Sequence, residues 1–334
     1  MRRFVIAAVA AGLAASPAPA NDSTAETAAG GLVLKQSAEI DMVSEDLFLS
    51  PDQVRVRYVF RNRSAKDVRT LVAFPMPDRD LSVEWQSDVA FPGNFQTRVD
   101  GRSVPMRVER KAILGPADHS ALLGQLKVPL GGDNGASGYA AIQDALDRLS
   151  AAQQTRLVRM GLAEREDEAD GRSRLMPKWT IRETWFWEQT FPAGRDLVVE
   201  HDYVPGTGGS VGTPLAMRDF RRSGEGRQEI RRYCADTAFL AGIDRLARQA
   251  RGGEYPTLPD LRLSYILRTG ANWRSPIGTF RLVVDKGAPE NLVSFCGEGI
   301  RKISPTRFEM KKSNWRPDRD LHILIVQPMP RDAG

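Results

Sequence analysis

The sequence predicts a mainly β protein of the α+β type, in which antiparallel β-sandwich regions carry helical insertions. Two stretches carry this prediction, because residues 54–60 and 68–76 both alternate apolar and polar side chains. Strict alternation over two such runs is typical of a half-buried antiparallel hairpin. Apolar residues instead recur at helical spacing in residues 142–160 and 230–246, which indicates helices between the strands.

The first twenty residues predict a signal peptide. Two arginines precede a short apolar run, and residues 18–20 read Ala-Pro-Ala, which favours cleavage after Ala20. The apolar run is too short to anchor the chain across a bilayer, and no later stretch is apolar for long enough to span one. We therefore expect an exported protein, periplasmic or secreted, with no transmembrane segment once the signal is removed.

The pattern divides the remaining chain into four segments. These are a flexible lead at 21–31, an N-terminal β-sandwich at 32–110, a helical insertion at 111–178 and a second β region at 179–330 with a helix near 228–250. We expect further strands in the sandwich near 32–42, 82–90, 95–100 and 103–109. In the insertion, Ser150 can begin a capping box, so two short helices are an alternative to one.

Charge and motif content exclude several functional classes. The formal net charge is +5, of which Arg2 and Arg3 contribute 2, so the chain without its signal would carry +3. This is not the dense basic footprint of a nucleic-acid-binding protein. Phosphate-cradling glycine patterns are absent, and the three histidines are widely scattered in the sequence. We therefore expect no nucleic acid partner, no metal and no cofactor.

The two cysteines, Cys234 and Cys296, are expected to form a disulfide. An isolated pair in an oxidising compartment is most often bonded. Two buried free thiols and a redox pair are the alternatives, although a redox pair usually has C-x-x-C spacing. Cys234 would then tie the predicted helix to the C-terminal strands around Cys296.

Two groups of residues could carry hydrolytic chemistry. Residues 208–212 read G-x-S-x-G, which makes Ser210 a candidate nucleophile, but no helix clearly opens after it and a glycine-rich loop is favoured. Asp41, Glu45 and Asp46 lie close together and could bind Ca²⁺ or act as acid and base. A calcium loop needs more oxygen ligands, so we favour a polar turn between two strands.

Basic and aromatic side chains supply candidate binding residues. Arg55, Arg57 and Arg61 share one face of a predicted strand, and Arg69 is expected to join them across the hairpin. Facing like charges repel, so either acids from another strand or an anionic envelope component should neutralise them.

Two tryptophans form the other candidate surface. Trp185 and Trp187 share a face with Phe191 and could stack on sugars or peptides, although burial in the core is the favoured interpretation.

The tetrad Phe-Pro-Met-Pro at 74–77 ends the second strand of the expected hairpin. Phe74 and Met76 continue its apolar face, whereas Pro75 and Pro77 have no backbone N–H for a ladder. The tetrad is therefore interpreted as a strand terminator.

Several ordered landmarks resemble a bacterial family of exported proteins catalogued as domain of unknown function 4424. They are "GGLVLKQSAEIDMVSEDLFLS", "VRYVFRN", "AFPMPD", "WFWEQTFPAG", "VEHDYVPG" and "NWRSPIG", and they span nearly the whole mature chain. The resemblance implies a secreted β-rich protein and brings no activity or cofactor. The N-terminal part also resembles a vault/inter-α-trypsin type β domain, which supports the predicted architecture.

Three functional hypotheses remain open from the sequence. The first is a non-enzymatic binding or scaffold protein of the periplasm or cell envelope, whose partner is an envelope protein or a glycan. The second is a periplasmic hydrolase that uses Ser210 or the Asp41, Glu45 and Asp46 cluster. The third is a structural subunit of an envelope assembly. A histidine or carboxylate within hydrogen-bond reach of Ser210 would favour the hydrolase.

Overall fold

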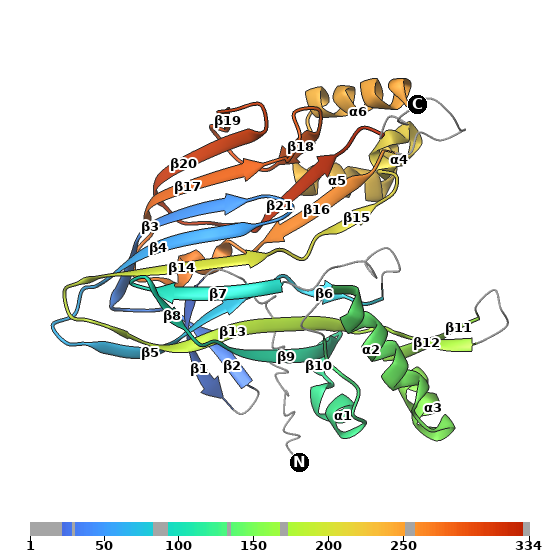
Figure 1. The fold of residues 1–334 in the computed structure, drawn as a ribbon, viewed down its shortest axis with the longest axis horizontal. Coiled ribbons are helices and arrows are strands. Elements are labelled where there is room, and N and C mark those ends of the chain that lie inside the picture. The colour runs from blue at the N-terminus through green and yellow to red at the C-terminus, as the bar shows by residue number, and fades with distance from the viewer. Residues whose placement is uncertain are drawn as a thin grey trace, which may run out of the picture.

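The computed structural model describes residues 22–28, 31–82, 93–131, 135–167, 173–250 and 258–329. Strands dominate these residues, which confirms the predicted mainly β class. Figure 1 shows two large sheets, a smaller sheet beside them, one group of helices at the upper right near the C-terminus and another at the lower right. The expected signal peptide and the strand expected near residues 82–90 lie outside the described residues, apart from Ser82.

The largest sheet has the strand order β19-β20-β17-β3-β4-β14-β7-β8. Its strands are β3 (Ile40–Leu49), β4 (Val54–Asn62), β7 (Gly93–Val99), β8 (Arg102–Val104), β14 (Asp196–Val204), β17 (Ile277–Asp285), β19 (Arg301–Lys302) and β20 (Arg307–Trp315). Neighbours are antiparallel except for β3 and β17, which are parallel. In β4 the apolar residues are buried and the arginines between them face outward, as the alternation predicts.

A second sheet has the order β10-β9-β13-β5-β1-β2, with β6 also paired to β13. Its strands are β1 (Ser23–Ala28), β2 (Gly31–Lys35), β5 (Val68–Pro75), β6 (Arg79–Asp80), β9 (Arg107–Leu114), β10 (Ala117–Asp118) and β13 (Thr180–Phe191). Residues 22–28 are therefore not a flexible lead. Their backbone completes the ladder between β2 and β5, and Asp22 is fully buried.

The hairpin expected from β4 and β5 does not form. β4 lies between β3 and β14, whereas β5 lies between β13 and β1 in the other sheet. The turn after Asn62 crosses between the sheets, and the Asn62 amide holds it by donating to the carbonyls of Lys66 and Phe191. Both strands bury an apolar face. Packing face to face across the core buries these faces as well as pairing within one sheet would, so the alternating pattern is compatible with either arrangement.

A third sheet, β15-β16-β21-β18, is covered on one face by helices. Its strands are β15 (Gly208–Ser210), β16 (Asp260–Tyr265), β18 (Leu292–Phe295) and β21 (Leu321–Val326), and its helices are η2 (Pro214–Ala216), α4 (Arg218–Arg222), α5 (Gly224–Tyr233) and α6 (Thr237–Gln249). The single helix expected near 228–250 is two helices. Cys234 ends α5 in the left-handed region with φ 50°, and Asp236 caps α6 by accepting from the Phe239 N–H.

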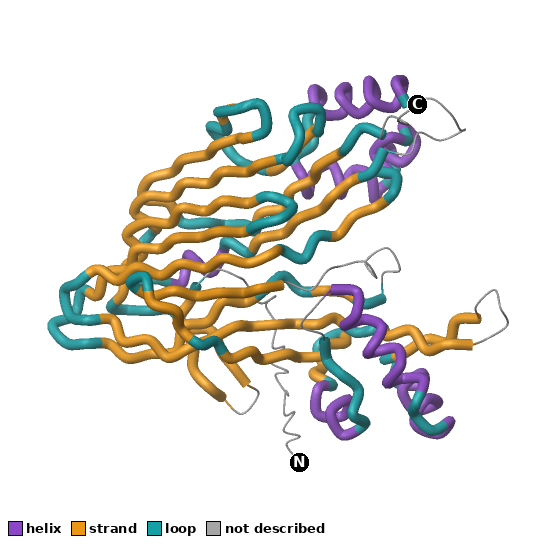
Figure 2. The backbone as a smooth tube through the Cα atoms, viewed as in Figure 1, coloured by secondary structure: helices purple, strands orange, loops and turns teal. Residues whose placement is uncertain are grey.

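The helical insertion lies below the C-terminal helices, at the lower right of the view (Figure 2). It contains α1 (Ser120–Gln125), α2 (Gly135–Asp147), α3 (Ala151–Arg159), β11 (Ala163–Asp167) and β12 (Ser173–Pro177). The capping box predicted at Ser150 is present, with Gln153 as its partner, and it separates α2 from α3. Of the two alternatives, one helix or two, the structure shows two.

One apolar core joins the three sheets. The inner face of the largest sheet contributes Tyr58 and Phe60, the second sheet contributes Phe74 and Trp187, and the third contributes Tyr265. Strands from 32–110 and from 179–330 therefore bury their side chains together. This shared core fixes the second and third sheets side by side, and their junction forms the hollow described next.

Candidate functional site

A cleft of about 560 Å³ lies where the turn after β5 meets β15, β16 and the helices α4 and α5. We call it the glycine-loop cleft. Its lining residues are Pro77, Asp78, Arg79, Gly206, Gly208, Gly209, Ser210, Gly212, Pro214, Met217, Phe220, Glu229, Arg232, Tyr233, Arg262 and Ser264. This volume is within the range of small-molecule sites, roughly 300–1,000 Å³.

The proline tetrad supplies one wall of the cleft. β5 ends at Pro75, as the sequence predicts, and the Met76 N–H then donates to the Glu183 carbonyl at 2.8 Å. Pro77 has no N–H for the ladder, and pairing with β13 resumes at Arg79 with the register shifted by one residue. Asp78 is fixed by two hydrogen bonds from Arg182, at 2.9 and 3.2 Å. The strand terminator therefore also shapes a binding surface.

The glycine loop supplies the opposite wall. Gly208 and Ser210 in β15 pair with Arg262 and Asp260 in β16, and the Ser210 N–H donates to the Asp260 carboxylate at 3.0 Å. A Cβ at Gly209 would lie 2.5 Å from the Asp260 carbonyl oxygen, which is closer than real contacts allow. Glycine is thus required for β15 to approach β16 closely.

Charged groups at the helical wall are paired within the protein. The Arg262 guanidinium contacts Glu229 at 2.6 Å and Asp260 at 3.2 Å. Burial would lower the pKa of Arg262, but Asp260 outweighs burial and the pKa is raised. Burial also raises the pKa of the neighbouring Tyr233 hydroxyl, so the phenol remains a neutral donor.

The charge of Arg79, in the wall formed by the proline tetrad, is also paired within the protein. Arg79 lies 3.4 Å from the Glu183 carboxylate, which also contacts Arg110 at 2.7 Å and accepts from the Trp185 indole at 2.8 Å. Burial lowers the pKa of Arg79 to about 10, which still leaves it protonated at neutral pH. The cleft therefore presents many polar atoms, and the charges of Arg79, Arg262 and Asp78 are compensated, whereas the exposed Arg232 has no ion pair with a described carboxylate.

Ser210 lies in this cleft without a base. Its Oγ is buried and has no hydrogen-bond partner among the described residues. His322, the histidine downstream of Ser210 in the sequence, hydrogen-bonds the Oγ of Ser264 at 2.9 Å instead. Burial, followed by Arg232, lowers the pKa of His322 to about 4, so this imidazole is a weak base.

A Thr-His-Asp chain, which sequence reasoning missed, lies inside the core. Thr97 Oγ1 is 2.8 Å from His201 Nδ1, and His201 Nε2 is 3.0 Å from Asp22. Each of the three residues is at most 1% exposed, so a substrate cannot reach them. Burial raises the pKa of Asp22 despite the nearby His201. The chain ties β7, β14 and the residue before β1 together, and its parts are too far apart in sequence to form a motif.

Asp41, Glu45 and Asp46 do not form one site. The polar turn expected there is instead the middle of β3, with a bulge between Met42 and Ser44. Glu45 is buried opposite Tyr58, whereas Asp46 contacts Arg281 on the exposed side. A bulge lets polar residues occupy a strand without breaking it, which alternation alone does not reveal.

Asp41 has its own set of partners. It accepts hydrogen bonds from Arg274, Arg63 and Ser275 at 2.7–2.9 Å. Burial would raise the pKa of Asp41, but these bonds outweigh it and lower the pKa to about 2.

The four candidate arginines do not share one surface. Arg55, Arg57 and Arg61 lie on β4, but Arg69 lies on β5 in the second sheet. Acids from the neighbouring strands meet three of them, and Arg55 lies 4.9 Å from the Phe48 ring centroid. The ion pairs are Arg57–Glu200 at 3.6 Å, Arg61–Asp196 at 2.5 Å and Arg69–Glu188 at 2.6 Å. These contacts leave less of their charge available to an anionic ligand.

The candidate tryptophans belong to the core and its edge. Trp187 is 2% exposed and donates its indole N–H to Gln189. Trp185 is half-buried and stacks on Phe95, with ring centroids 5.0 Å apart. Stacking within the protein covers much of the surface that a sugar would use.

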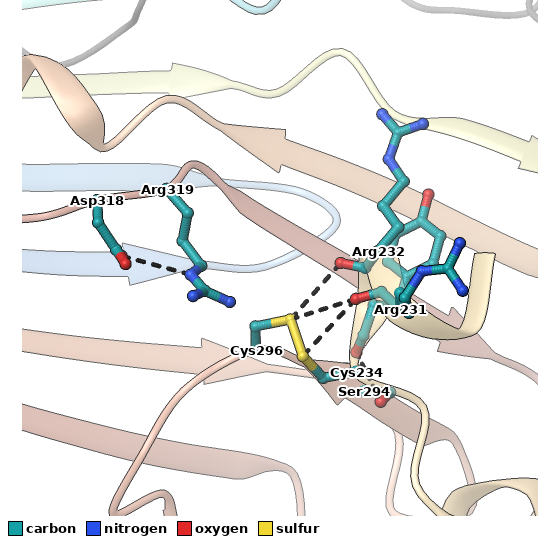
Figure 3. The surroundings of a disulfide bond; sticks show 8 residues. Arg231, Arg232, Cys234, Ser294, Cys296, Asp318 and Arg319 are labelled. Carbon is teal, nitrogen blue, oxygen red and sulfur yellow. Dashed lines mark hydrogen bonds and ion pairs between the residues drawn. A yellow bond between two sulfur atoms is a disulfide. The ribbon is translucent and has the colours of Figure 1, made fainter. Parts of the chain in front are cut away.

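The disulfide lies at the end of α5. Cys234 and Cys296 are bonded, with their Cα atoms 5.0 Å apart, so the predicted pairing is present. Figure 3 shows the bond between the helix turn that carries Arg231 and Arg232 and the loop that carries Asp318 and Arg319. Ser294 holds the same turn by donating to the Tyr233 carbonyl at 2.9 Å. The bond thus fixes a turn whose Arg232 and Tyr233 line the cleft.

Comparisons with known proteins place the chain in a family. In the described part of the chain, no helix is long and apolar enough to cross a membrane. Curated proteins provide no match. A matching solved structure is that of a "putative nutrient binding protein" from Legionella pneumophila, with 14% identity, coverage of 92% of this chain and 70% of that chain, and a TM-score of 0.44. The family model described as "Domain of unknown function (DUF4424)" matches residues 20–324, which include the whole cleft and both cysteines, so the chain belongs to this family.

Proposed function

We propose that the protein is an exported, non-enzymatic binding protein of the cell envelope, and that the glycine-loop cleft takes a neutral glycan segment. The observation that carries the proposal is the charge state of most of the cleft wall, because Arg79, Arg262 and Asp78 each already have an oppositely charged partner, whereas the exposed Arg232 is the one described lining arginine without one. Such pairs offer donors and acceptors to hydroxyl groups without favouring an ion.

The remaining lining fits the same class of ligand. Phe220, Met217 and Pro77 supply apolar surface, on which the C–H face of a sugar ring can pack. The glycine loop adds backbone polar groups without side chains to obstruct them. Export rests on the sequence pattern of residues 1–20, and the disulfide is compatible with an oxidising compartment. An envelope location would give the cleft access to glycans.

Filling the cleft tests the proposal. Gly208 pairs with Arg262, which lines the cleft, so a side chain at 208 would lie on the same face. A Cβ there meets only the Arg262 Cβ, at 3.9 Å, so Gly208→Trp should fold and occupy the space. We expect wild type to bind at least one of maltotriose, cellotriose or triacetylchitotriose in calorimetric titrations, and Gly208→Trp to bind it at least tenfold more weakly.

The matched control is Gly124→Trp in α1, where a Cβ has open space and which is not among the residues that line the cleft. This variant should bind like wild type. If none of the trisaccharides binds, or if the two tryptophan variants bind equally well, the cleft is not a glycan site.

A further inference from the structure

A second hollow of about 470 Å³ lies against the disulfide. We call it the disulfide groove. Its floor contains Leu267, Met310 and Leu321, each at most 4% exposed, and Trp315 lines it as well. Trp315 is held by Phe280, with ring centroids 4.7 Å apart. This part of the hollow has a recessed apolar floor, and Glu298, Lys312 and Arg316 also line the hollow.

The groove continues into a shallower hollow with a basic lining. The two hollows share Cys296, Asp318, Arg319 and Asp320. The second hollow is also lined by Arg231, Arg232, Arg268 and His322. One continuous depression therefore has an apolar end and a cationic end.

The cations at the basic end are not all compensated. Arg268 is paired with Asp320 at 2.9 Å, and Arg319 contacts Asp318 at 3.4 Å. Arg231 and Arg232 are exposed, and no ion pair joins either of them to a carboxylate in the described parts of the chain. Cationic residues in a last helical turn are favoured by the helix dipole. The dipole does not account for an apolar hollow that opens beside them.

We propose that this depression binds a small amphiphilic anion, a carboxylate on a single unbranched apolar chain. The carboxylate lies against Arg231 and Arg232, and the chain lies over Leu267, Met310 and Trp315. Charge complementarity selects the anion. The recessed floor favours a free molecule over a membrane, because a single alkyl chain can enter a hollow of about 470 Å³ that a flat bilayer would cover without filling.

The test uses dodecanoate below its micelle-forming concentration, titrated into the full chain by calorimetry. Decanoate and octanoate should bind progressively more weakly, because each removed methylene leaves apolar floor uncovered. Dodecyltrimethylammonium has the same chain and the opposite charge, and it should bind at least tenfold more weakly than dodecanoate.

Two charge reversals locate the site. Arg231→Glu should weaken dodecanoate binding at least tenfold, whereas Arg245→Glu, the same change at an exposed position of α6 outside both hollows, should leave it unchanged. Circular dichroism checks that both variants fold. The proposal is overturned if dodecanoate does not bind, or if dodecanoate and dodecyltrimethylammonium bind equally well. It is also overturned if Arg231→Glu and Arg245→Glu bind dodecanoate equally well, or if the protein binds only phosphatidylglycerol vesicles.

Discussion

The glycine-loop cleft and the disulfide groove share one turn of α5 but differ in how their charges are balanced. Tyr233 lines the cleft, Cys234 lines the groove, and Arg232 lines both the cleft and the basic end of the depression. In the cleft, Arg262 is held by two acids. At the basic end, Arg231 is exposed and has no such partner among the described residues.

This difference indicates that ion pairing, rather than the number of charged residues, separates the two proposed ligand classes. A paired arginine still donates hydrogen bonds, but its field is cancelled nearby. An unpaired arginine favours an anion and gains more from it where apolar walls reduce screening. Changes that remove an ion pair, or that release the shared turn of α5, should therefore reduce the difference in ligand preference between the cleft and the groove.

The largest expected effect comes from the disulfide. Replacing Cys234 and Cys296 by serine should lower the free energy of unfolding by about 4 kcal/mol, because the bond closes a loop across 62 residues of sequence separation. Urea denaturation measures the loss, and dithiothreitol should reproduce it in the wild type. Binding at the cleft and at the groove should weaken together, since the bond holds their shared turn.

The serine variant also has an informative negative outcome. If it keeps wild-type stability and both affinities, the turn is held instead by contacts such as the Ser294–Tyr233 hydrogen bond. In that case the two hollows do not depend on the bond.

The sequence was most informative about faces and ends of strands. The alternation in β4 correctly separates buried Tyr58 and Phe60 from the outward arginines, and Pro75 ends β5. Alternation does not identify a partner strand, so the prediction that β4 and β5 pair as a hairpin was wrong. Two strands with apolar faces can lie side by side in one sheet or pack face to face from two sheets. The same alternating sequence pattern is compatible with both arrangements.

The candidate site was less predictable, because long-range contacts build it. Glu229, Arg262 and Arg79 come from three distant parts of the chain, and their pairing depends on how the sheets join. Ser210 was singled out from its glycine neighbours, and it does line the cleft, but the base that a nucleophile needs is not beside it. A local motif reports a local turn, whereas catalysis needs side chains that only the fold brings together.

Protonation of His322, which lies between the two hollows, should lower the free energy of unfolding by an intermediate amount. His322 lines the basic end, and its partner Ser264 lines the cleft. Its pKa is lowered from 6.5 to about 4, so the unfolded chain binds a proton at a pH where the folded chain does not. The stability due to His322 is therefore complete above pH 6.5 and is lost as the pH falls towards 4.

After a discount for partial exposure, this loss should amount to about 2 kcal/mol. His322→Gln should flatten the decline between pH 6.5 and 4 in urea denaturation curves. His119→Gln, in a loop of the distant insertion, is the matched control. An identical decline in wild type and His322→Gln would contradict a neutral, partly buried imidazole at this position.

The smallest expected effect tests the charge balance of the cleft directly. Glu229→Gln keeps the size of the side chain but leaves Arg262 paired with Asp260 alone. The affinity for the neutral trisaccharide should fall about tenfold, which is about 1.4 kcal/mol, because a hydrogen-bonded ion pair is lost from the wall. Trigalacturonate should bind more tightly to the variant than to wild type, since the cleft gains one positive charge. Glu225→Gln, on an exposed part of the same helix, should change neither affinity, and equal shifts in both variants would mean that local pairing does not select the ligand.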